Sequence, residues 1–536
     1  MKKSFLVTAP PPTPNGELHL GHLSGPYLGA DVFTRAQRSF GNDVVYLCST
    51  DDHQSYCVTK AIEEKRTVEE AIGDYSSRIQ DVLLAANIRM DCFTSPRRPE
   101  HFRRVQKLFL DLYKAGKLQV NEEPTCFCLE CNRYLFEAYV KGACIHCDAP
   151  SGGNYCEECG HPSDPIHLKN PQCTICHHPP VIKTFKRVVF SLEDYREELT
   201  RYYEKHSYQW KPQLKKLYSE LLSKKLPDVP ITNLEDWGVP VPLPDFEGHV
   251  INVWFEMLPG HMETASVWAK ENGLEQDFWA KNSPTEMVQF FGFDNSFYYA
   301  VVHIAMLAAL GNHKAADGLI TNQFYLQDRA KFSKSRGNAI WGSEFLETEH
   351  SDWVRYYLCY SNPENRQTHF SLTEYTQIVE QRIGQEWHAY LAKLTSLCGR
   401  NSKGQEISSA AEDHIAHFRR KFSACYGVES FSLKNAADDL HQFMVGADQI
   451  IEQTQSAIDA YYFLRALAVF SAPITPIFSS DLGEYLGYQD SNPIKWECLD
   501  QAPLPVEKSL QNSVLNKLDS YENQFFKETA SSILHD

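Results

Sequence analysis

The chain has 536 residues, of which 43% are hydrophobic and 23% charged. This length predicts about three or four domains, and the composition is typical of a globular enzyme. The net charge of −17 argues against a generally basic nucleic-acid-binding protein, although a local basic groove can still bind RNA. No run approaches the ~18 uninterrupted apolar residues that span a membrane, and the first apolar stretch is too short for a signal peptide. We therefore expect a cytoplasmic protein without membrane contact.

The first fifty residues predict the opening of a doubly wound parallel sheet. Residues 4–8 are β-prone, a Pro- and Gly-rich loop follows, residues 19–40 form a helical pattern, and residues 44–48 are a second apolar run. Strand, loop, helix and strand in this order are typical of a Rossmann-type α/β domain. Ligands bind beyond the carboxyl ends of such strands, so residues 8–16 and 49–53 should face the binding site.

The later elements follow from the same patterns. From residue 371 onward the apolar spacing is almost wholly helical, in about five segments. The predicted helices before that point are 67–87, 99–117, 193–225 and 296–310, the later strands of the sheet are 250–255, 287–291 and 318–323, and a cysteine-rich stretch covers 126–176.

Two histidines follow the first loop in the sequence His19-Leu20-Gly21-His22. Free amide donors and the dipole at a helix N-terminus favour phosphate. Two imidazoles one helical turn apart can bridge the phosphate chain and the base of ATP. Considered alone, the pattern fits a pair of structural histidines equally well.

A basic loop with the sequence Lys331-Phe332-Ser333-Lys334-Ser335 follows the last predicted strand. Two lysines three residues apart can close over pyrophosphate and neutralise the charge that develops in a transition state. A basic run of this kind is more often a solvated surface loop.

Eight of the sixteen cysteines form four Cys-x-x-Cys pairs within one short stretch. In a chain without an export signal this pattern is typical of metal ligation. Two such pairs make one closed tetrahedral Cys₄ zinc site with Zn–S bonds of ~2.3 Å, so four pairs allow two structural sites. The pairs are Cys128/Cys131, Cys144/Cys147, Cys156/Cys159 and Cys173/Cys176.

Together, the histidine motif after the first strand and the lysine motif after the last resemble the two signatures of class I aminoacyl-tRNA synthetases. Within the class, the chain is most similar to the methionyl-tRNA synthetase family over essentially its whole length. The family pattern implies nested zinc sites, with Cys144, Cys147, Cys156 and Cys159 around one ion and the outer pairs around the other. The further matching segments are Val7-Thr8, Asn15-Gly16, Ala30-Asp31-Val32, Trp237-Gly238-Val239-Pro240, Val253-Trp254-Phe255, Gly292-x-Asp294, Ala305-Met306-Leu307 and Arg355-Tyr356-Tyr357.

The resemblance also implies a division of the chain and a role for each matching residue. The implied parts are the first catalytic half (1–117), a connective insertion with zinc knuckles at about 126–178 (118–231), the second catalytic half (232–322), a linker with the lysine loop (323–370) and a helical domain similar to anticodon-binding domains (371–536). The implied catalytic residues are His19, His22, Lys331 and Lys334; those at the nucleotide are Asn15, Gly16, Gly21, Gly292, Asp294, Ser333 and Ser335; those at the amino acid are Pro11, Thr13, Asp51, Trp254, Met257, His261, Tyr299 and His303.

Three of these residues have specific expected partners. Asp51 would hold the substrate's α-ammonium group, which needs a carboxylate in a closed site, although an N-cap aspartate is common at such a position. Asp294 would accept hydrogen bonds from the ribose hydroxyls of ATP. Trp254 would line the amino-acid pocket, and a core aromatic is an equally good reading of its residue type.

The pocket and the helical domain depart from the family pattern. Changes of polarity and shape in the wall favour another amino acid, and His261, Tyr299 and His303 would suit a polar side chain. The family's Pro-Trp pair that recognises the anticodon is absent after residue 371, and bases are normally stacked on aromatic rings. The departures are Pro11-Pro12-Thr13 for Leu-Pro-Tyr, Glu256-Met257-Leu258 for Asp-Ala-Pro, His261 for Tyr, Phe293 for Lys, Tyr299 for His, His303 for Trp, and residues 393–395 and 453–460 in the anticodon region.

The leading hypothesis is an ATP-dependent ligase that uses Mg²⁺ and two structural Zn²⁺ ions and forms an aminoacyl-adenylate. As a specialised paralogue with a non-methionine substrate, it would pass the acyl group to tRNA or to a small nucleophile, with a separate enzyme as partner in the second case. One alternative is an ordinary, divergent methionine–tRNA ligase. Another is a non-catalytic, zinc-dependent RNA-binding protein.

Overall fold

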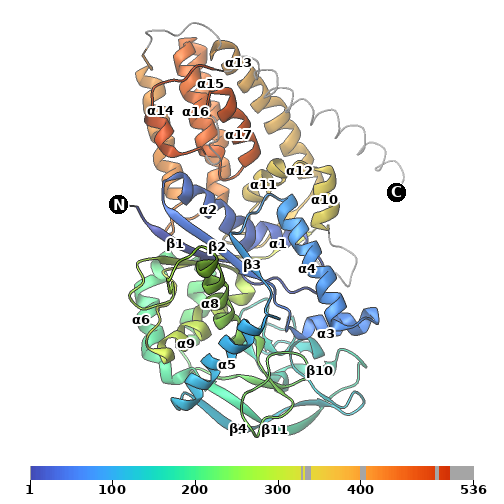
Figure 1. The fold of residues 1–536 in the computed structure, drawn as a ribbon. Coiled ribbons are helices and arrows are strands. Elements are labelled where there is room, and N and C mark those ends of the chain that lie inside the picture. Colours follow the sequence, from blue (N-terminus) through green and yellow to red (C-terminus); the bar gives the residue numbers. More distant parts are fainter. Residues whose placement is uncertain (1, 328–329, 332–339, 399–405, 489–493, 507–536) are drawn as a thin grey trace, which may run out of the picture.

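Figure 1 shows the protein as a computed structural model, which describes residues 2–327, 330–331, 340–398, 406–488 and 494–506. At its centre lies a five-stranded sheet with the order β16-β15-β1-β2-β3, in which every pairing is parallel. The order reverses between β1 and β15, the point beside which doubly wound sheets bind ligands. The predicted Rossmann-type α/β fold is therefore confirmed. The strands are β1 (Ser4–Thr8), β2 (Asp43–Ser49), β3 (Cys92–Thr94), β15 (Glu286–Gly292) and β16 (Gly318–Asn322).

Both faces of the sheet are buried, because successive side chains of a strand point to opposite faces. Phe5 and Val7 of β1 pack into the core formed with α2, α4 and the helical region, whereas Leu6 packs into the core formed with α5, α8 and α9. Figure 1 shows these two groups of helices on either side of the strands. The helices are α1 (Leu20–His22), η1 (Leu23–Tyr27), α2 (Leu28–Ser39), α3 (Ser55–Glu64), α4 (Val68–Ala85), α5 (Pro99–Lys114), α8 (Val253–Glu271), η6 (Phe293–Asn295), η7 (Tyr298–Val302) and α9 (His303–Leu310).

One predicted strand is wrong. Residues 250–255 do not join the parallel sheet: β14 (His249–Ile251) pairs antiparallel with β13 (Thr232–Leu234), and α8 begins directly afterwards. The Asn252 side chain accepts a hydrogen bond from the Trp254 amide at 2.9 Å. This N-cap satisfies one of the amides that a helix start leaves without a partner, so the apolar run turns into a helix.

The insertion is built on a long antiparallel pair, β4 (Leu118–Cys128) and β11 (Val181–Ser191), at the end of the molecule opposite the helical bundle (Figure 1). The single helix expected over 193–225 is two helices, α6 (Arg196–His206) and α7 (Pro212–Leu222). Pro212 explains the break, because proline is favoured at the first helical position and disfavoured inside a helix. Short strands lie next to the cysteines: β5 (Arg133–Tyr134), β6 (Val140–Ala143), β7 (Pro150–Ser151), β8 (Asn154–Tyr155), β9 (Pro162–Ser163) and β10 (Lys169–Cys173).

The C-terminal part is helical, as predicted. The described residues after 371 form five longer helical runs, the first of which joins α12, η9 and α13 without a break, and a short 3-10 helix, η10 (Trp496–Asp500). None of the described helices is long and apolar enough to be a membrane span. The bounds are α12–α13 (Leu372–Cys398), α14 (Ser409–Cys425), α15 (Leu433–Thr454), α16 (Ala457–Ser471) and α17 (Pro476–Tyr485).

The linker carries a small sheet and two helices between the parallel sheet and the bundle. It consists of β17 (Tyr325–Gln327), β18 (Ala330–Lys331), α10 (Gly342–Thr348), α11 (Ser351–Tyr360) and β19 (Thr368–Phe370).

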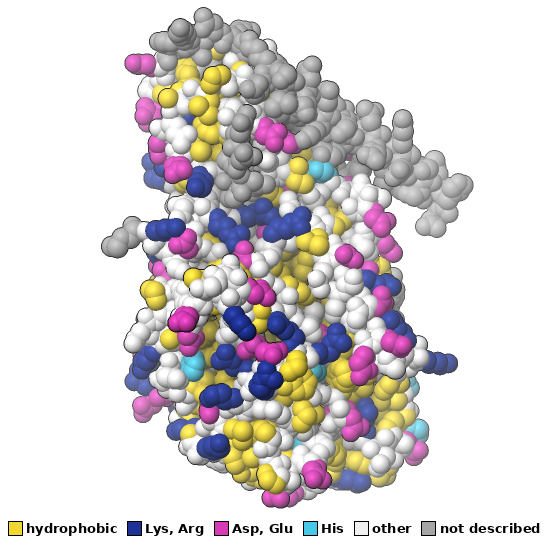
Figure 2. All heavy atoms as spheres, in the orientation of Figure 1, with side chains coloured by type: hydrophobic (Ala, Val, Ile, Leu, Met, Phe, Trp, Pro, Cys, Tyr) yellow, Lys and Arg dark blue, Asp and Glu magenta, His cyan; other side chains and the backbone are white. Residues whose placement is uncertain are grey.

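On the face drawn in Figure 2, Lys and Arg side chains gather below the helical bundle, with Asp and Glu among them. The net charge of −17 is therefore not spread evenly over the surface.

A buried ion cluster joins the linker to the sheet domain. The Asp31 carboxylate on α2 accepts hydrogen bonds from Arg35 Nε and from Arg355 Nη2, both at 2.7 Å. Arg355 on α11 also donates to the carbonyls of Pro473 and Ile474. Burial alone would raise the pKa of Asp31, but the two guanidinium groups outweigh it and lower this pKa. One carboxylate therefore connects α2, α11 and the end of the bundle.

Replacing Asp31 with Ala should lower the free energy of unfolding by about 3–5 kcal/mol, because Arg355 would be left as a buried charge without its carboxylate. Because the folded-state pKa of Asp31 is lowered, the wild-type contribution is fully present above about pH 4 and is lost as the pH falls through the folded-state pKa. Urea unfolding at pH 7 and at low pH measures both effects.

The control for this variant is Lys107→Ala, which removes an exposed pair with Asp111 and should cost about 0–1 kcal/mol. Equal destabilisation by the two variants would contradict the role of the buried cluster.

Candidate functional site

A cavity of about 600 Å³ lies at the carboxyl edge of the parallel sheet, beside β1 and β15. It gathers residues from segments far apart in the sequence: the loop after β1, the end of β2, the start of α8 and the turn after β15. Most of the predicted site residues line it. They are Pro11, Thr13, Asn15, Gly16, His19, Gly21, His22, Asp51, Trp254, Met257, Gly292 and Asp294.

The two histidines of the first motif lie at the start of a helix. His19 is the N-cap of α1, and its backbone amide donates to His22 Nδ1 at 3.2 Å. The two rings stack with centroids 3.7 Å apart. Both rings line the cavity, so they are placed to contact a phosphate-bearing ligand there.

The chain that follows the lysine loop returns to the segment of these histidines. Lys331 is the last residue of β18, and Ser333, Lys334 and Ser335 lie outside the described residues. The chain resumes at Ile340, whose carbonyl accepts a hydrogen bond from the Leu20 amide at 3.3 Å. The roles predicted for the loop stay predictions, but its far end lies next to the first motif.

Gly292 and Asp294 form the turn after β15. A Cβ added at Gly292 would lie 2.4 Å from Asp294 Oδ1, so only glycine lets the aspartate fold back against the strand end. Both residues line the cavity, in the position from which a carboxylate can accept hydrogen bonds from a hydroxyl-bearing ligand.

Asp51 is a buried carboxylate that faces the cavity. Burial raises its pKa well above the usual range; a hydrogen bond with Gln54 opposes this, and the nearby Glu256 and Glu137 add to it. No lysine or arginine is among the described residues that line the cavity. A ligand that brought an ammonium group to Asp51 would supply the missing positive charge and restore the ionised carboxylate.

Trp254 forms one wall and is held from several sides. Its indole Nε1 donates to Glu137 Oε1 at 2.5 Å, its ring stacks on Tyr298 at 4.3 Å, and its edge meets Tyr155 at 5.0 Å. Glu137 also accepts hydrogen bonds from Ser55 and Asn154. Trp254 is therefore both an aromatic residue of the core and a residue that lines the cavity.

Three predicted pocket residues lie behind the wall and do not line the cavity. His261 Nε2 lies 2.9 Å from the Tyr299 hydroxyl, and His303 Nε2 donates to the Trp254 carbonyl at 3.1 Å. All three side chains are buried. His303 Nδ1 is buried without a hydrogen-bond partner among the described residues. None of the three residues is among the described residues that line the cavity, so the structure gives no support to a direct contact with a polar substrate side chain.

The insertion contributes residues that the sequence patterns did not indicate. Glu137, Tyr155 and Glu157 come from the segments around the cysteine pairs, and the last two line the cavity. The sequence patterns predict only a structural role for this region. Tyr155 and Glu157 flank Cys156, and a position beside a metal knuckle is the one signal that could have indicated them. Tyr27, Gln54, Tyr56, Asn295, Asn322, Gln323 and Tyr325 also line the cavity without a motif.

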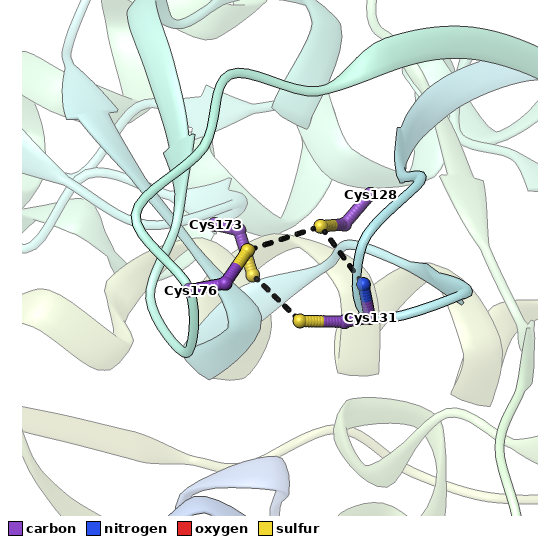
Figure 3. Close-up of side chains that lie close together, drawn as sticks. All are labelled: Cys128, Cys131, Cys173 and Cys176. Atoms are coloured by element: carbon purple, nitrogen blue, oxygen red, sulfur yellow. Dashed lines mark hydrogen bonds between the residues drawn. The ribbon is translucent and has the colours of Figure 1, made fainter.

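The eight paired cysteines form two clusters with the predicted nesting. Cys128, Cys131, Cys173 and Cys176 converge in one (Figure 3), and Cys144, Cys147, Cys156 and Cys159 in the other. The Sγ–Sγ distances are 3.3 and 3.8 Å in the first cluster and 3.9 and 3.6 Å in the second. A tetrahedron with ~2.3 Å Zn–S bonds has edges of about 3.8 Å, so both clusters fit a zinc ion.

A third group, His53, His101 and Glu256, has the ligand types of a metal site. However, both imidazole nitrogens approach the same carboxylate oxygen, Glu256 Oε1, at 2.7 Å. Ligands around zinc at ~2.0–2.1 Å would lie about 3.3 Å apart, whereas 2.7 Å is a hydrogen-bond distance. Burial would raise the pKa of Glu256, but the two histidines lower it to about 2. The group is a hydrogen-bonded ion cluster.

Comparison with known proteins agrees with this geometry. Residues 5–395 match the family model described as class I tRNA synthetases (M). The chain is 32% identical to methionine–tRNA ligase of Pyrococcus furiosus over 396 residues, which cover 71% of this chain and 54% of that protein. It is 33% identical to methionine–tRNA ligase of Dehalococcoides mccartyi strain CBDB1, with 70% and 68% covered.

The fold also matches solved structures. A methionyl-tRNA synthetase from Mycobacterium tuberculosis bound by methionyl-adenylate superposes with a TM-score of 0.76 at 19% identity, over 94% of this chain and 98% of that chain. The matched part spans only about half of several curated relatives, 54% and 56% in two archaeal enzymes. With the family match over most of its length, the chain belongs to the methionyl (M) family of class I tRNA synthetases.

Proposed function

We propose that this protein is an ATP-dependent ligase that activates an α-amino acid as its adenylate. The observation that carries the proposal is the convergence of His19, His22, Asp51 and Asp294 on one cavity at the carboxyl edge of the sheet. Asp51 would hold the α-ammonium group, Asp294 the ribose, and the histidines the triphosphate. The substrate carboxylate would then attack the α-phosphate in line, with pyrophosphate as leaving group and Mg²⁺ bound to the nucleotide.

We further propose that the amino acid is not methionine. A thioether is recognised mainly by apolar fit, and the wall around Trp254 differs from the family pattern in shape and polarity. Met257 stands where the family has alanine, and the family's tyrosine of the first loop is Thr13. These changes support a specialised paralogue with the domain division predicted above. The relatives' printed name, methionine–tRNA ligase, favours the alternative of an ordinary methionine-specific enzyme.

The acceptor is proposed to be tRNA or a small nucleophile supplied by a separate enzyme in the same cytoplasmic compartment. Both tryptophans after residue 371, Trp387 and Trp496, are buried, so neither is available to stack an anticodon base. Lys393 of the corresponding helix pairs with Asp448 and Glu452. These contacts support a bundle without the family's anticodon recognition.

The two cysteine clusters are proposed to bind one structural Zn²⁺ each. Their donor sets are complete and leave no open position for a substrate. The cluster of Cys144, Cys147, Cys156 and Cys159 also affects the cavity, because Tyr155 and Glu157 flank Cys156 and line the cavity. Zinc in this cluster would hold that part of the wall in place.

Lys334→Ala should lower the rate of ATP–pyrophosphate exchange by about 100-fold and change the affinity for ATP much less, because the lysine acts on charge that develops in the transition state. Exchange kinetics with a panel of amino acids, together with calorimetric titration of ATP, measure the two quantities. Unchanged turnover would refute the role. Lys107→Ala, a surface lysine on α5, serves as the control and should exchange normally.

The same panel tests the substrate class of the enzyme. Strong exchange with methionine at low concentration would favour the ordinary methionine–tRNA ligase. A complete lack of exchange, combined with tight tRNA binding, would favour the non-catalytic RNA-binding protein. Charging of total tRNA then separates a tRNA acceptor from a small nucleophile.

Purified protein should contain about two zinc ions per chain, since each closed site needs four thiolates. Cys156→Ser and Cys128→Ser should each lower the zinc content by about one equivalent, as measured by elemental analysis. Because Cys156 lies between two lining residues, its variant should also raise KM for the amino acid more than the Cys128 variant does. Equal KM values in the two variants, or a full zinc content in either, would contradict this assignment.

A further inference from the structure

The space behind the amino-acid end of the cavity is closed by a hydrogen bond between two helical segments. His261 lies on α8 and Tyr299 in η7, and their polar atoms are 2.9 Å apart. Their side chains have exposed fractions of 2% and 0%. A substrate side chain that reached between α8 and η7 would have to break this bond and leave both polar groups buried without partners, which is unfavourable.

The ring of Tyr299 is buried against β15, the strand whose following turn lines the cavity. It stacks on Phe291 of β15, with centroids 4.8 Å apart and planes 15° apart, and it lies 5.1 Å from the ring of His303. Burial raises the pKa of Tyr299, and the nearby Cys48 and Asp51 add to the effect. The hydroxyl end of the ring is therefore close to the carboxylate that would hold the substrate.

Trp254 cannot swing aside to enlarge the cavity without breaking several buried contacts. Its indole nitrogen donates to Glu137, its amide to Asn252, and its carbonyl accepts from His303. Tyr298 covers one face of the ring at 4.3 Å. Since each contact lies in a close-packed interior, the wall is rigid.

The two histidines behind this wall carry no charge at neutral pH. Burial lowers the pKa of His261 to about 3, and His303 adds to the effect. Burial lowers the pKa of His303 to about 4, against the opposing hydrogen bond to Trp254. Both imidazoles are therefore neutral, so an ionised substrate side chain would find no partner on them.

We propose that the amino acid activated here has a side chain no larger than a hydroxymethyl group, as in glycine, alanine or serine. The proposal rests on the function proposed above. With the α-ammonium group at Asp51, the side chain points to the wall of Trp254 and Met257, and Tyr299 fills the space behind that wall. Methionine and leucine are excluded by overlap with this wall.

The test measures pocket size apart from turnover. Calorimetry on the full chain compares sulfamoyl-adenosine analogues of the adenylates that carry glycine, alanine, serine, methionine or leucine. We expect at least one of the three small analogues to bind at least about 100-fold more tightly than the methionine and leucine analogues, since a single methylene already discriminates by about 10–200-fold. Binding of the methionine analogue within ten-fold of the best small analogue would overturn the proposal, as would a failure of all five to bind.

Two variants test which part of Tyr299 excludes large side chains. Tyr299→Ala should raise the affinity for the methionine analogue by at least ten-fold and change that for the alanine analogue less. Tyr299→Phe keeps the ring and loses the bond to His261, so it should still exclude methionine. Thermal melting checks that both variants fold. If Tyr299→Phe admits methionine as well as Tyr299→Ala does, the hydrogen bond and not the ring is the barrier, and the ring-filling argument is wrong.

Exchange kinetics separate this proposal from the one on which it rests. Exchange with methionine alone would leave amino-acid activation standing and overturn the small-substrate proposal. No exchange with any amino acid would count against amino-acid activation, while the analogue titrations would still decide the size of the pocket.

Discussion

The buried carboxylate of Asp31 determines how the helical part sits on the parallel sheet. It is 1% exposed, and a charge at such a site requires close partners of opposite sign. Arg35 and Arg355 provide them, and Arg355 extends the connection to carbonyls near the start of α17. Because α11 carries Arg355, the part of the linker that follows the lysine loop is held against the catalytic domain.

The position of the linker in turn defines one side of the cavity. The segment at Ile340 returns to Leu20, and Gly342 donates to the Leu18 carbonyl at 2.9 Å. The lysine loop therefore ends where the histidine motif begins. The histidine motif lies more than 300 residues before the lysine loop, and backbone hydrogen bonds join its segment to the chain that follows that loop. The sheet order places the loops after β1 and β15 side by side.

Sequence patterns predicted the parts of this arrangement that depend on local order. The strand–loop–helix–strand opening, the four Cys-x-x-Cys pairs and the helical C-terminal part all follow from spacing along the chain, and the nesting of the pairs follows from the family resemblance. The strand predicted at 250–255 was wrong because an apolar run of this length fits a strand or a buried helix equally well, and the Asn252 cap decides between them. Residue type alone also could not place Tyr299 of η7, because its position depends on a hydrogen bond to His261 of α8.

The insertion shows most clearly why site residues escape sequence analysis. Glu137 belongs to no motif and has a positive φ of 49°, yet it is the hydrogen-bond acceptor for the indole of Trp254. Its carboxylate is buried, and burial raises its pKa against three opposing hydrogen bonds, the first of them from Trp254. Zinc knuckles on either side can hold a short irregular segment in such a conformation, because their cross-links replace the large core that this region lacks. The insertion is thus a structural element and a wall of the cavity at once, because its Glu137 holds Trp254 and its Tyr155 and Glu157 line the cavity.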